Sequence, residues 1–387
     1  MLLQNEKLNF DYANAVDNQL TDREINAKYQ EGELRILTEQ GRYPLQNIVE
    51  IMGTMNLNPE YQRRRVWSNE QKSRLIESFI MNIPVPPVFL YEISFSKYEV
   101  MDGLQRLSTL FDFYNGNFQL EGLEIWSELN GRNIYNLPEN IKSGIDRRYI
   151  STVVILNETA KNKNEEQFLK KFVFERLNTG GTKLTPQETR NALFDGPMNK
   201  LCISIAYENE IFKNIFEIPD ANESLLENAL YKRMEDVELV LRFFAYRQLS
   251  SFKVSKISDI LDNYLEKANI KYNPEILEKL EKLFNDTIFL VYKIFDDKAF
   301  RFKSLDRNKD FVNWSKPSKM IYDPIMFILS EYSQNIEVRN KLIENRNIIN
   351  ERFEKVMNDN PNEFSGRNNN KADVLRRIEL FKGIFDL

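Results

Sequence analysis

The stretch Tyr98–Leu110, YEVMDGLQRLSTL, constrains the fold more than any other part of this sequence, because it predicts a strand that turns directly into a helix. Tyr98 and Val100 alternate with charged residues, as in a half-buried strand. Apolar residues then recur at intervals of three and four, which is the pattern of an amphipathic helix: Leu104, Leu107, Leu110 and Phe111. Asp102 or Gly103 is placed to cap that helix.

The turn between this strand and this helix carries residues suited to an anion. Gly103 allows close approach of the backbone, Arg106 offers a planar fork of donors, and Asp102 and Gln105 add an acid and an amide. Free N–H groups and the positive end of the helix dipole favour a phosphate at the same point. The plain alternative is a capped helix with a solvated Arg106, and D-G-x-Q-R alone does not decide between the two.

The chain of 387 residues contains no histidine and one cysteine, Cys202. Serine–histidine hydrolysis, histidine-ligated zinc and histidine-dependent ββα-metal nuclease chemistry are therefore excluded within the chain. Cys202 lies in an apolar segment and is expected to be a small core residue, so a disulfide framework and a cysteine zinc site are also excluded. The sequence has no G-x-x-x-x-G-K-[ST] motif, which argues against a Walker-type NTPase.

The formal net charge of −5 argues against a surface coated for non-specific DNA binding, although local basic patches remain. Arginines cluster at 63–65, 147–148 and 376–377, and a solvated face is the plain interpretation of each cluster. There is neither a run of eighteen apolar residues nor a basic-then-apolar leader, so we expect a cytoplasmic protein without membrane association.

The pattern along the chain predicts an α+β fold, with a small mixed sheet and its helices followed by a mostly α-helical region. Strands are expected at Val88–Ile93 and Lys97–Asp102, which pair, and Ser151–Asn157 adds a third. Beyond Glu165 the periodicity is helical, with breaks expected at Pro186, Pro197, Pro219, Pro274 and Pro324. We expect a polar leader over 1–40, a compact domain over 41–195 and an α-helical domain over 196–387.

Two further blocks flank the strand–turn–helix stretch, at Asn58–Ile93 and at Phe174–Leu193. In this order and spacing the three blocks resemble the N-terminal domain family of the GmrSD-type modification-dependent restriction endonucleases, which is related in fold to the ParB and sulfiredoxin N-terminal domains. The matching residues are Tyr61-Gln62-Arg63, Trp67, Gln71 to Leu75, Ile83 to Pro87, the D-G-x-Q-R block, Arg176-Leu177-Asn178, Gly180, Gly181, Leu184 and Glu188. They cover roughly residues 40 to 195. Most members read D-G-Q-Q-R, whereas Leu104 stands here at the first of the two glutamine positions.

The resemblance implies that residues 41–195 form a ParB-like nucleotide-binding domain that takes an NTP and Mg²⁺. Arg106 would then pair with phosphate, Asp102 would hold the metal or accept a proton, and Gln105 would orient the attacking water. Leu104 leaves one fewer polar group for the nucleotide or its metal. The other residues implied in nucleotide binding are Gln62, Arg63, Gly103, Arg176, Asn178, Gly180 and Gly181.

The block RLNTGGTKLTPQE predicts a helix, a Gly-Gly loop and a second helix. The loop is either an anion-binding nest or a plain turn between helices. Thr185 is expected to cap the second helix, with Pro186 at its first position and Glu188 completing a capping box.

These features favour a nucleotide-binding and NTP-hydrolysing regulatory subunit of a bacterial or phage-encoded DNA-defence system. DNA, a separate nuclease or other defence subunit, and further copies of the chain are the expected partners, since the resembling enzymes carry their histidine-dependent nuclease in another domain or subunit. A ParB-like DNA-binding clamp or adaptor that binds nucleotide without hydrolysis and a scaffold with an inactive pocket remain open. So does a carboxylate-type metal nuclease, although no segment shows its pattern persuasively.

Overall fold

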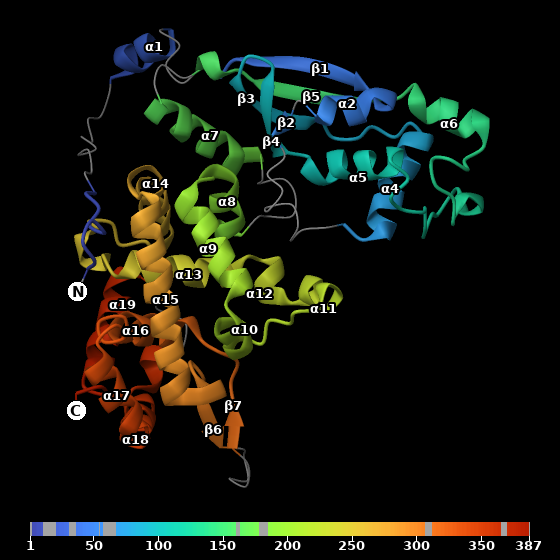
Figure 1. The fold of residues 1–387 in the computed structure, drawn as a ribbon. Helices are drawn as coiled ribbons and strands as arrows, with labels where there is room; N and C mark the ends of the chain where they lie inside the picture. The colour runs from blue at the N-terminus through green and yellow to red at the C-terminus, as the bar shows by residue number, and fades with distance from the viewer. Residues whose placement is uncertain are drawn as a thin grey trace. The chain divides into compact units, whose positions relative to one another are not determined.

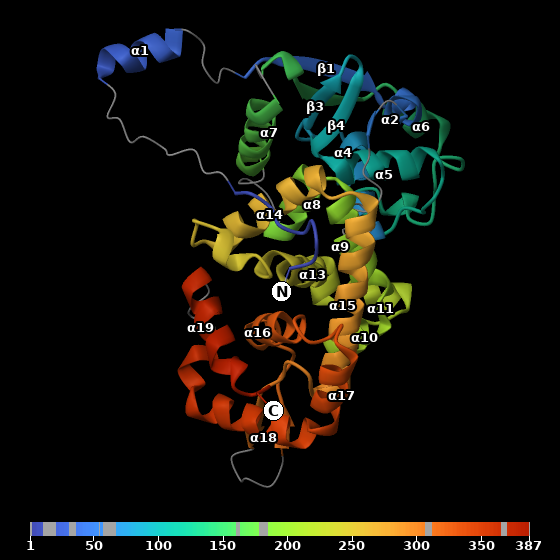
Figure 2. The ribbon, with the colours of Figure 1, turned by 60° about the vertical axis from the view of Figure 1, so that its left-hand side comes forward.

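The computed structural model describes residues 2–10, 21–30, 36–53, 55–56, 67–159, 163–177, 185–305, 312–364 and 370–386. The chain divides into two compact units, whose elements are labelled in Figures 1 and 2. The sheet unit is Val16–Leu184, and the helical unit combines Met1–Ala15 with Thr185–Leu387. In sequence, therefore, the sheet unit is an insertion into the helical unit.

In the described part of the sheet unit, five strands form a mixed sheet in the order β1-β5-β3-β4-β2. β3 pairs antiparallel with β4 and parallel with β5, so that Leu90 lies opposite Val100 on one side and Val154 on the other. These are the three strands that the sequence predicts, and their pairing is confirmed. The strands are β1 (Thr38–Pro44), β2 (Met55–Asn56), β3 (Val88–Ser94), β4 (Lys97–Asp102) and β5 (Tyr149–Ile155).

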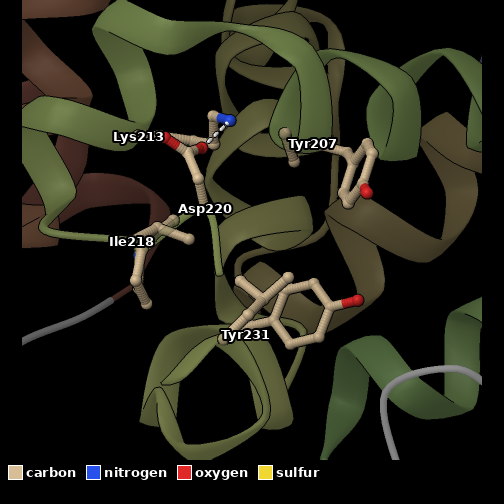
Figure 3. Close-up of a pocket in the computed structure, with 8 residues that line it drawn as sticks. Tyr207, Lys213, Ile218, Asp220 and Tyr231 are labelled. Carbon is tan, nitrogen blue, oxygen red and sulfur yellow. Dashed lines mark hydrogen bonds and ion pairs between the residues drawn. The ribbon is translucent and has the colours of Figure 1, made fainter. Parts of the chain in front are cut away.

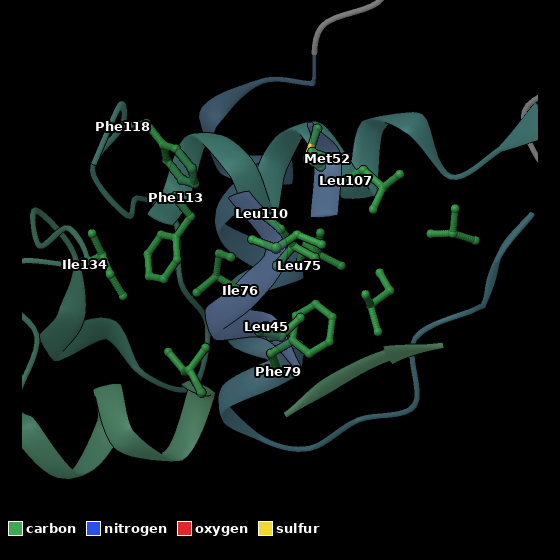
Figure 4. Packing of buried hydrophobic residues seen from close by; sticks show 14 of the residues in the cluster. Leu45, Met52, Leu75, Ile76, Phe79, Leu107, Leu110, Phe113, Phe118 and Ile134 are labelled. Atoms are coloured by element: carbon green, nitrogen blue, oxygen red, sulfur yellow. The ribbon is translucent and has the colours of Figure 1, made fainter. Parts of the chain in front are cut away.

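The apolar core of the sheet unit gathers side chains from the sheet and its helices (Figure 4). Fully buried members include Leu45, Ile76, Leu90, Leu107, Leu110 and Phe113. The helix that carries Leu107 and Leu110 presents them at the spacing that the sequence predicts, and it therefore packs one face into this core. The helices of the unit are α1 (Asp22–Gln30), α2 (Ile48–Met52), α4 (Asn69–Ile80), α5 (Leu104–Tyr114), α6 (Glu139–Asp146) and α7 (Lys163–Leu177).

A buried carboxylate fixes the loop that follows α5. Glu77 of α4 accepts hydrogen bonds from the backbone N–H groups of Glu124, Ile125 and Trp126, at 3.3, 2.8 and 2.9 Å. Burial raises the pKa of Glu77, but the three N–H groups and the charge of Arg74 outweigh burial, so the net effect lowers the pKa below its ordinary value. The ionised carboxylate thus stabilises this loop.

The helical unit consists, where described, of helices and one two-stranded hairpin. α13 is almost wholly buried, and its Arg242 makes a bidentate ion pair with Asp323 of α16, at 3.0 and 2.5 Å. The elements are α8 (Pro186–Leu193), α9 (Pro197–Glu208), α10 (Glu210–Phe216), α11 (Asn222–Glu227), α12 (Ala229–Lys232), α13 (Glu235–Tyr246), α14 (Ile257–Lys271), α15 (Pro274–Phe295), β6 (Lys303–Leu305), β7 (Val312–Trp314), α16 (Lys319–Leu329), α17 (Ile336–Glu344), α18 (Arg346–Asp359) and α19 (Lys371–Lys382).

The expected helix break at Pro324 is wrong, because Pro324 lies inside α16. Proline removes one helical hydrogen bond and crowds the preceding turn, which disfavours this position locally. Ile321, Tyr322 and Ile325 on either side are fully buried, so packing of the flanking side chains outweighs the local cost. Pro186, Pro197 and Pro274 do begin helices, as the sequence predicts.

The first described residues of the chain belong to the helical unit. Glu6, whose side chain is fully buried, accepts hydrogen bonds from Nε and Nη2 of Arg247 at 2.7 and 2.9 Å. Tyr272 donates to the Glu6 carbonyl at 2.6 Å, and the Phe10 ring lies 3.9 Å from that of Phe252. Residues 2–10 are therefore an integral part of this unit.

The architecture is α+β, with a mixed sheet early in the chain and helices in most of the rest, and it confirms the predicted fold class. Among the described residues, every helix is too short or too polar to cross a membrane.

Candidate functional site at the junction of β4 and α5

The junction between β4 and α5 depends on Gly103, the residue that caps the helix. Its φ of 95° lies in the left-handed region, which side chains other than that of glycine rarely tolerate. A Cβ placed here would lie 2.8 Å from Cγ2 of Val88 and 3.0 Å from Nη2 of Arg106. Both the backbone conformation and the available space therefore require glycine.

Arg106 links this junction to the turn that precedes β3. Its Nη1 donates to the carbonyl oxygens of Pro86 and Pro87 at 2.5 and 3.3 Å. Its Nη2 donates to Oδ2 of Asp102 at 2.6 Å. The side chain of Arg106 is 12% exposed and that of Asp102 is 37% exposed, so the arginine is the more enclosed partner.

Gln105 makes a similar link to the start of α4. Its Oε1 accepts a hydrogen bond from the backbone N–H of Trp67 at 3.2 Å. Trp67 comes two residues after the arginine cluster at 63–65 in the sequence. The structure therefore brings together Asp102, Gly103, Gln105 and Arg106.

Most of the remaining residues predicted for the site cannot be compared with this junction. Gln62, Arg63, Asn178, Gly180 and Gly181 lie outside the described residues. Arg176 lies on the last turn of α7, where its guanidinium carbon is 4.8 Å from the centre of the Phe172 ring.

An ion pair attaches α7 to the strand that ends at Asp102. Lys170 Nζ lies 2.5 Å from Oε2 of Glu99 on β4 and 5.8 Å from the centre of the Tyr91 ring on β3. Burial, and then the carboxylates of Glu166 and Glu99, raise the pKa of the Tyr91 hydroxyl, which therefore stays protonated at neutral pH. These contacts fix the helix that carries Arg176 on the sheet.

The predicted cap of the second helix of the Gly-Gly block is confirmed. Thr185 Oγ1 accepts from the Glu188 N–H at 3.2 Å, and Oε2 of Glu188 accepts from the Thr185 N–H at 2.6 Å, with Pro186 at the first helical position. Cys202 is buried as expected, and burial raises the pKa of its thiol.

Among the described residues of the junction, Asp102 is the carboxylate that could bind a metal ion. Within the described residues no three metal-ligating side chains of His, Cys, Asp or Glu converge. Asp102 is also already engaged by Arg106. Mg²⁺ is commonly held by one or two carboxylates together with substrate phosphates. The described part of the junction thus fits a metal that arrives with a phosphate ligand.

Sequence reasoning missed the partners of Arg106 and Gln105. The Pro86 and Pro87 carbonyls and the Trp67 N–H are backbone groups, which a motif of side chains does not reveal. The signal that the sequence did offer is the Pro84-Val85-Pro86-Pro87 run, because such a segment leaves its carbonyls free to accept hydrogen bonds.

A separate pocket of about 110 Å³ lies in the helical unit (Figure 3). Tyr207, Ile218 and Tyr231 line it, and an ion pair between Lys213 and Asp220 borders it. It contains none of the residues predicted for the site, and its volume is below the roughly 300 Å³ at which ligand pockets begin.

A mixed sheet with helices, in which a left-handed glycine joins a strand to a helix beside an arginine, an acid and an amide, defines an α+β domain. Residues 45–194 match the family described as the GmrSD restriction endonuclease, N-terminal domain. The chain therefore contains a GmrSD N-terminal domain over these residues, which confirms the resemblance seen in the sequence and indicates a component of a restriction-like defence system. The match ends within the segment that follows α8, so it includes the first helix of the helical unit as well as most of the sheet unit. Neither a curated protein nor a solved structure matches the chain.

Proposed function

We propose that this chain binds and hydrolyses a nucleoside triphosphate with Mg²⁺, and that it is the regulatory subunit of a DNA-defence system in which a separate nuclease cuts. The observation that supports this most is the β4–α5 junction inside a GmrSD N-terminal domain. There a guanidinium, a glycine in the left-handed region and the start of an eleven-residue helix meet. Helix starts and arginine forks both favour phosphate.

Two features of the helix start support phosphate binding. Its cap residue, Gly103, has no side chain to satisfy the first N–H groups, and among the described residues of α5 no acidic side chain lies in the first turn. The N-terminal partial positive charge is thus not neutralised within the helix itself. A separate nuclease is part of the proposal because the sequence contains no histidine for a histidine-dependent nuclease.

Nucleotide binding by the purified chain tests this proposal. We expect calorimetry with each NTP and Mg²⁺, with and without DNA, to show binding of at least one NTP and release of its phosphate. Arg106→Ala should weaken binding at least about tenfold, as loss of a charged hydrogen bond does. Arg74→Ala is the control, because Arg74 belongs to the same unit and its side chain is 61% exposed.

Because Arg106 also holds the Pro86–Pro87 turn, thermal unfolding must show that the variant is folded before its affinity is compared. Arg106→Lys adds a second test, since lysine keeps the charge without the fork. If no NTP binds to the wild-type chain, or if the folded Arg106 variants bind as well as wild type, the proposal is wrong.

One observation favours a second function, a DNA-binding clamp that binds nucleotide without turning it over. Gln105, the residue expected to orient water, already accepts a hydrogen bond from Trp67, and Leu104 offers no polar group in its place. Binding of NTP without phosphate release in the calorimetry samples would select the clamp, and multiple turnovers would reject it.

A further inference from the structure

Arg106 is held from two sides by groups of different kinds. On one side the carbonyl oxygens of Pro86 and Pro87, which are neutral, accept from Nη1. On the other side the charged carboxylate of Asp102 accepts from Nη2. The guanidinium is therefore fixed by backbone at one edge, while the side chain of Asp102 occupies the edge where an anion would bind.

The exposure of the two side chains indicates which of them moves when this ion pair opens. Arg106 is 12% exposed and keeps its two carbonyl acceptors, whereas Asp102 is 37% exposed and can be solvated by rotation of its side chain. An enclosed charge without a partner is costly, but an exposed carboxylate loses little when water replaces its partner. Asp102 is thus the partner that can leave.

We propose that Asp102 is an internal counter-ion, which occupies Arg106 when no ligand is bound and is displaced from it by phosphate. The inference rests on the proposed function, because it concerns the same site. Phosphate and carboxylate accept from the same Nη2 edge, and both carry negative charge, so they compete for Arg106. Asp102 therefore weakens metal-free phosphate binding, whereas a carboxylate that assisted binding would strengthen it.

Whether removal of the Asp102 charge strengthens or weakens phosphate binding distinguishes a counter-ion from a carboxylate that assists binding. We expect Asp102→Asn to bind pyrophosphate about five- to tenfold more tightly than wild type in buffer with EDTA, because the amide keeps the shape of the side chain and loses its charge. The control is Asp112→Asn. Asp112 lies on the same α5 and pairs with Lys72 at 2.7 Å, with side-chain exposures of 12% for Lys72 and 29% for Asp112, so the change in charge and in burial is matched.

The experiment measures the affinity of wild type, Asp102→Asn and Asp112→Asn for pyrophosphate and for ATP, GTP, CTP and UTP, by calorimetry. Asp102→Ser is a second variant in case the amide holds Arg106 as firmly as the carboxylate does, and thermal unfolding checks that each variant is folded. Tighter pyrophosphate binding by the Asp102 variants alone supports the inference. Unchanged or weaker binding by the Asp102 variants, or an equal gain in Asp112→Asn, overturns it.

Failure of the inference and failure of the proposed function give different results. If wild type binds an NTP and the Asp102 variants bind pyrophosphate no better, only the counter-ion inference fails. If the Asp102 variants bind pyrophosphate more tightly while no protein binds any NTP, only the proposed function fails. If no protein binds pyrophosphate or NTP, both fail.

Discussion

Gly103 is the residue on which the β4–α5 junction depends most directly. Its left-handed φ and its close approach to Val88 are independent requirements, and only glycine meets both. The side chains on either side of it, Asp102 and Arg106, reach each other across this residue. A change at Gly103 is therefore expected to disturb the ion pair as well as the backbone.

We expect Gly103→Ala to lower the free energy of unfolding of the sheet unit by about 2–4 kcal/mol, from backbone strain together with the clash against Val88. Gly131→Ala is the matched control. Gly131 has a φ of 82°, but no described atom lies within 4 Å of the place that its Cβ would take, so only the strain of about 1 kcal/mol should remain. Urea denaturation of both variants measures the difference, and equal losses would show that the contact with Val88 is unimportant.

For single residues, the sequence predicts which side chains of the junction lie close together. It does not predict the backbone groups with which Arg106 and Gln105 form hydrogen bonds. Asp102, Gly103 and Arg106 are close because they lie within one turn of chain, and a local motif contains that information. The acceptor Pro86 is 20 residues from Arg106, and the donor Trp67 is 38 residues from Gln105. Such pairs depend on how strands and helices pack, which side-chain spacing does not encode.

Among the elements, α4 does more than pack against the core, because its Glu77 organises the loop at 124–126. Glu77 accepts hydrogen bonds from the N–H groups of three consecutive residues, so one carboxylate fixes the path of the whole loop. Ile125 and Trp126 of this loop remain partly exposed, and they line a cavity with Leu129 and Pro138. The shape of that surface thus depends on the charge state of Glu77.

We expect the sheet unit to lose stability in acid through Glu77. Because its pKa is lowered in the folded chain, its contribution is complete above the ordinary value of 4.5 and is lost as pH falls through the folded value. Glu77→Gln should lower the free energy of unfolding by about 1–2 kcal/mol at pH 7. It should also make that free energy fall less steeply as the pH is lowered. Urea unfolding at pH 7 and below pH 4.5 measures both effects. Glu128→Gln, in the turn that follows this loop, should keep the wild-type pH dependence, and a Glu77→Gln profile parallel to wild type would contradict this role.

Elements whose signals are local were predicted, and elements that depend on distant packing were not. Thr185, Pro186 and Glu188 alone are enough to predict the cap of α8. β1 was missed because TEQGRYP is polar and lies at the sheet edge, where alternation is weak. The break predicted at Pro324 is wrong because a buried helix can retain a proline that an isolated helix would exclude.

At the scale of the whole molecule, the insertion of the sheet unit makes the helical unit depend on segments that are far apart in the sequence. Glu6 and Arg247, which are 241 residues apart, form a buried ion pair, and Ser330 accepts a further hydrogen bond from Arg247 at 2.8 Å. No periodicity in the sequence links these residues, so this contact lies beyond pattern-based prediction.

We expect Glu6→Ala to destabilise the helical unit by about 3–5 kcal/mol, because Arg247 then lacks the buried carboxylate that balances its charge. The double variant Glu6→Met with Arg247→Met should be less destabilised than Glu6→Ala, since no charge is left buried. Hydrogen exchange, read separately for the two units, measures the effect. Asn9→Ala, at an exposed position of the same segment, should be neutral, and an equal loss in both units would contradict a role confined to the helical unit.

The Glu6–Arg247 pair also sets an order of events during synthesis. Residues 2–10 leave the ribosome well before the rest of the helical unit, and their binding site is incomplete until Arg247, Phe252 and Tyr272 have been made. At about 5–20 residues per second this interval is roughly 10–50 s, long enough for the inserted sheet to form first. Residues 2–10, which carry apolar side chains and the carboxylate of Glu6, therefore stay undocked during this interval, and a bulky fusion placed next to them would interfere with the last step of folding.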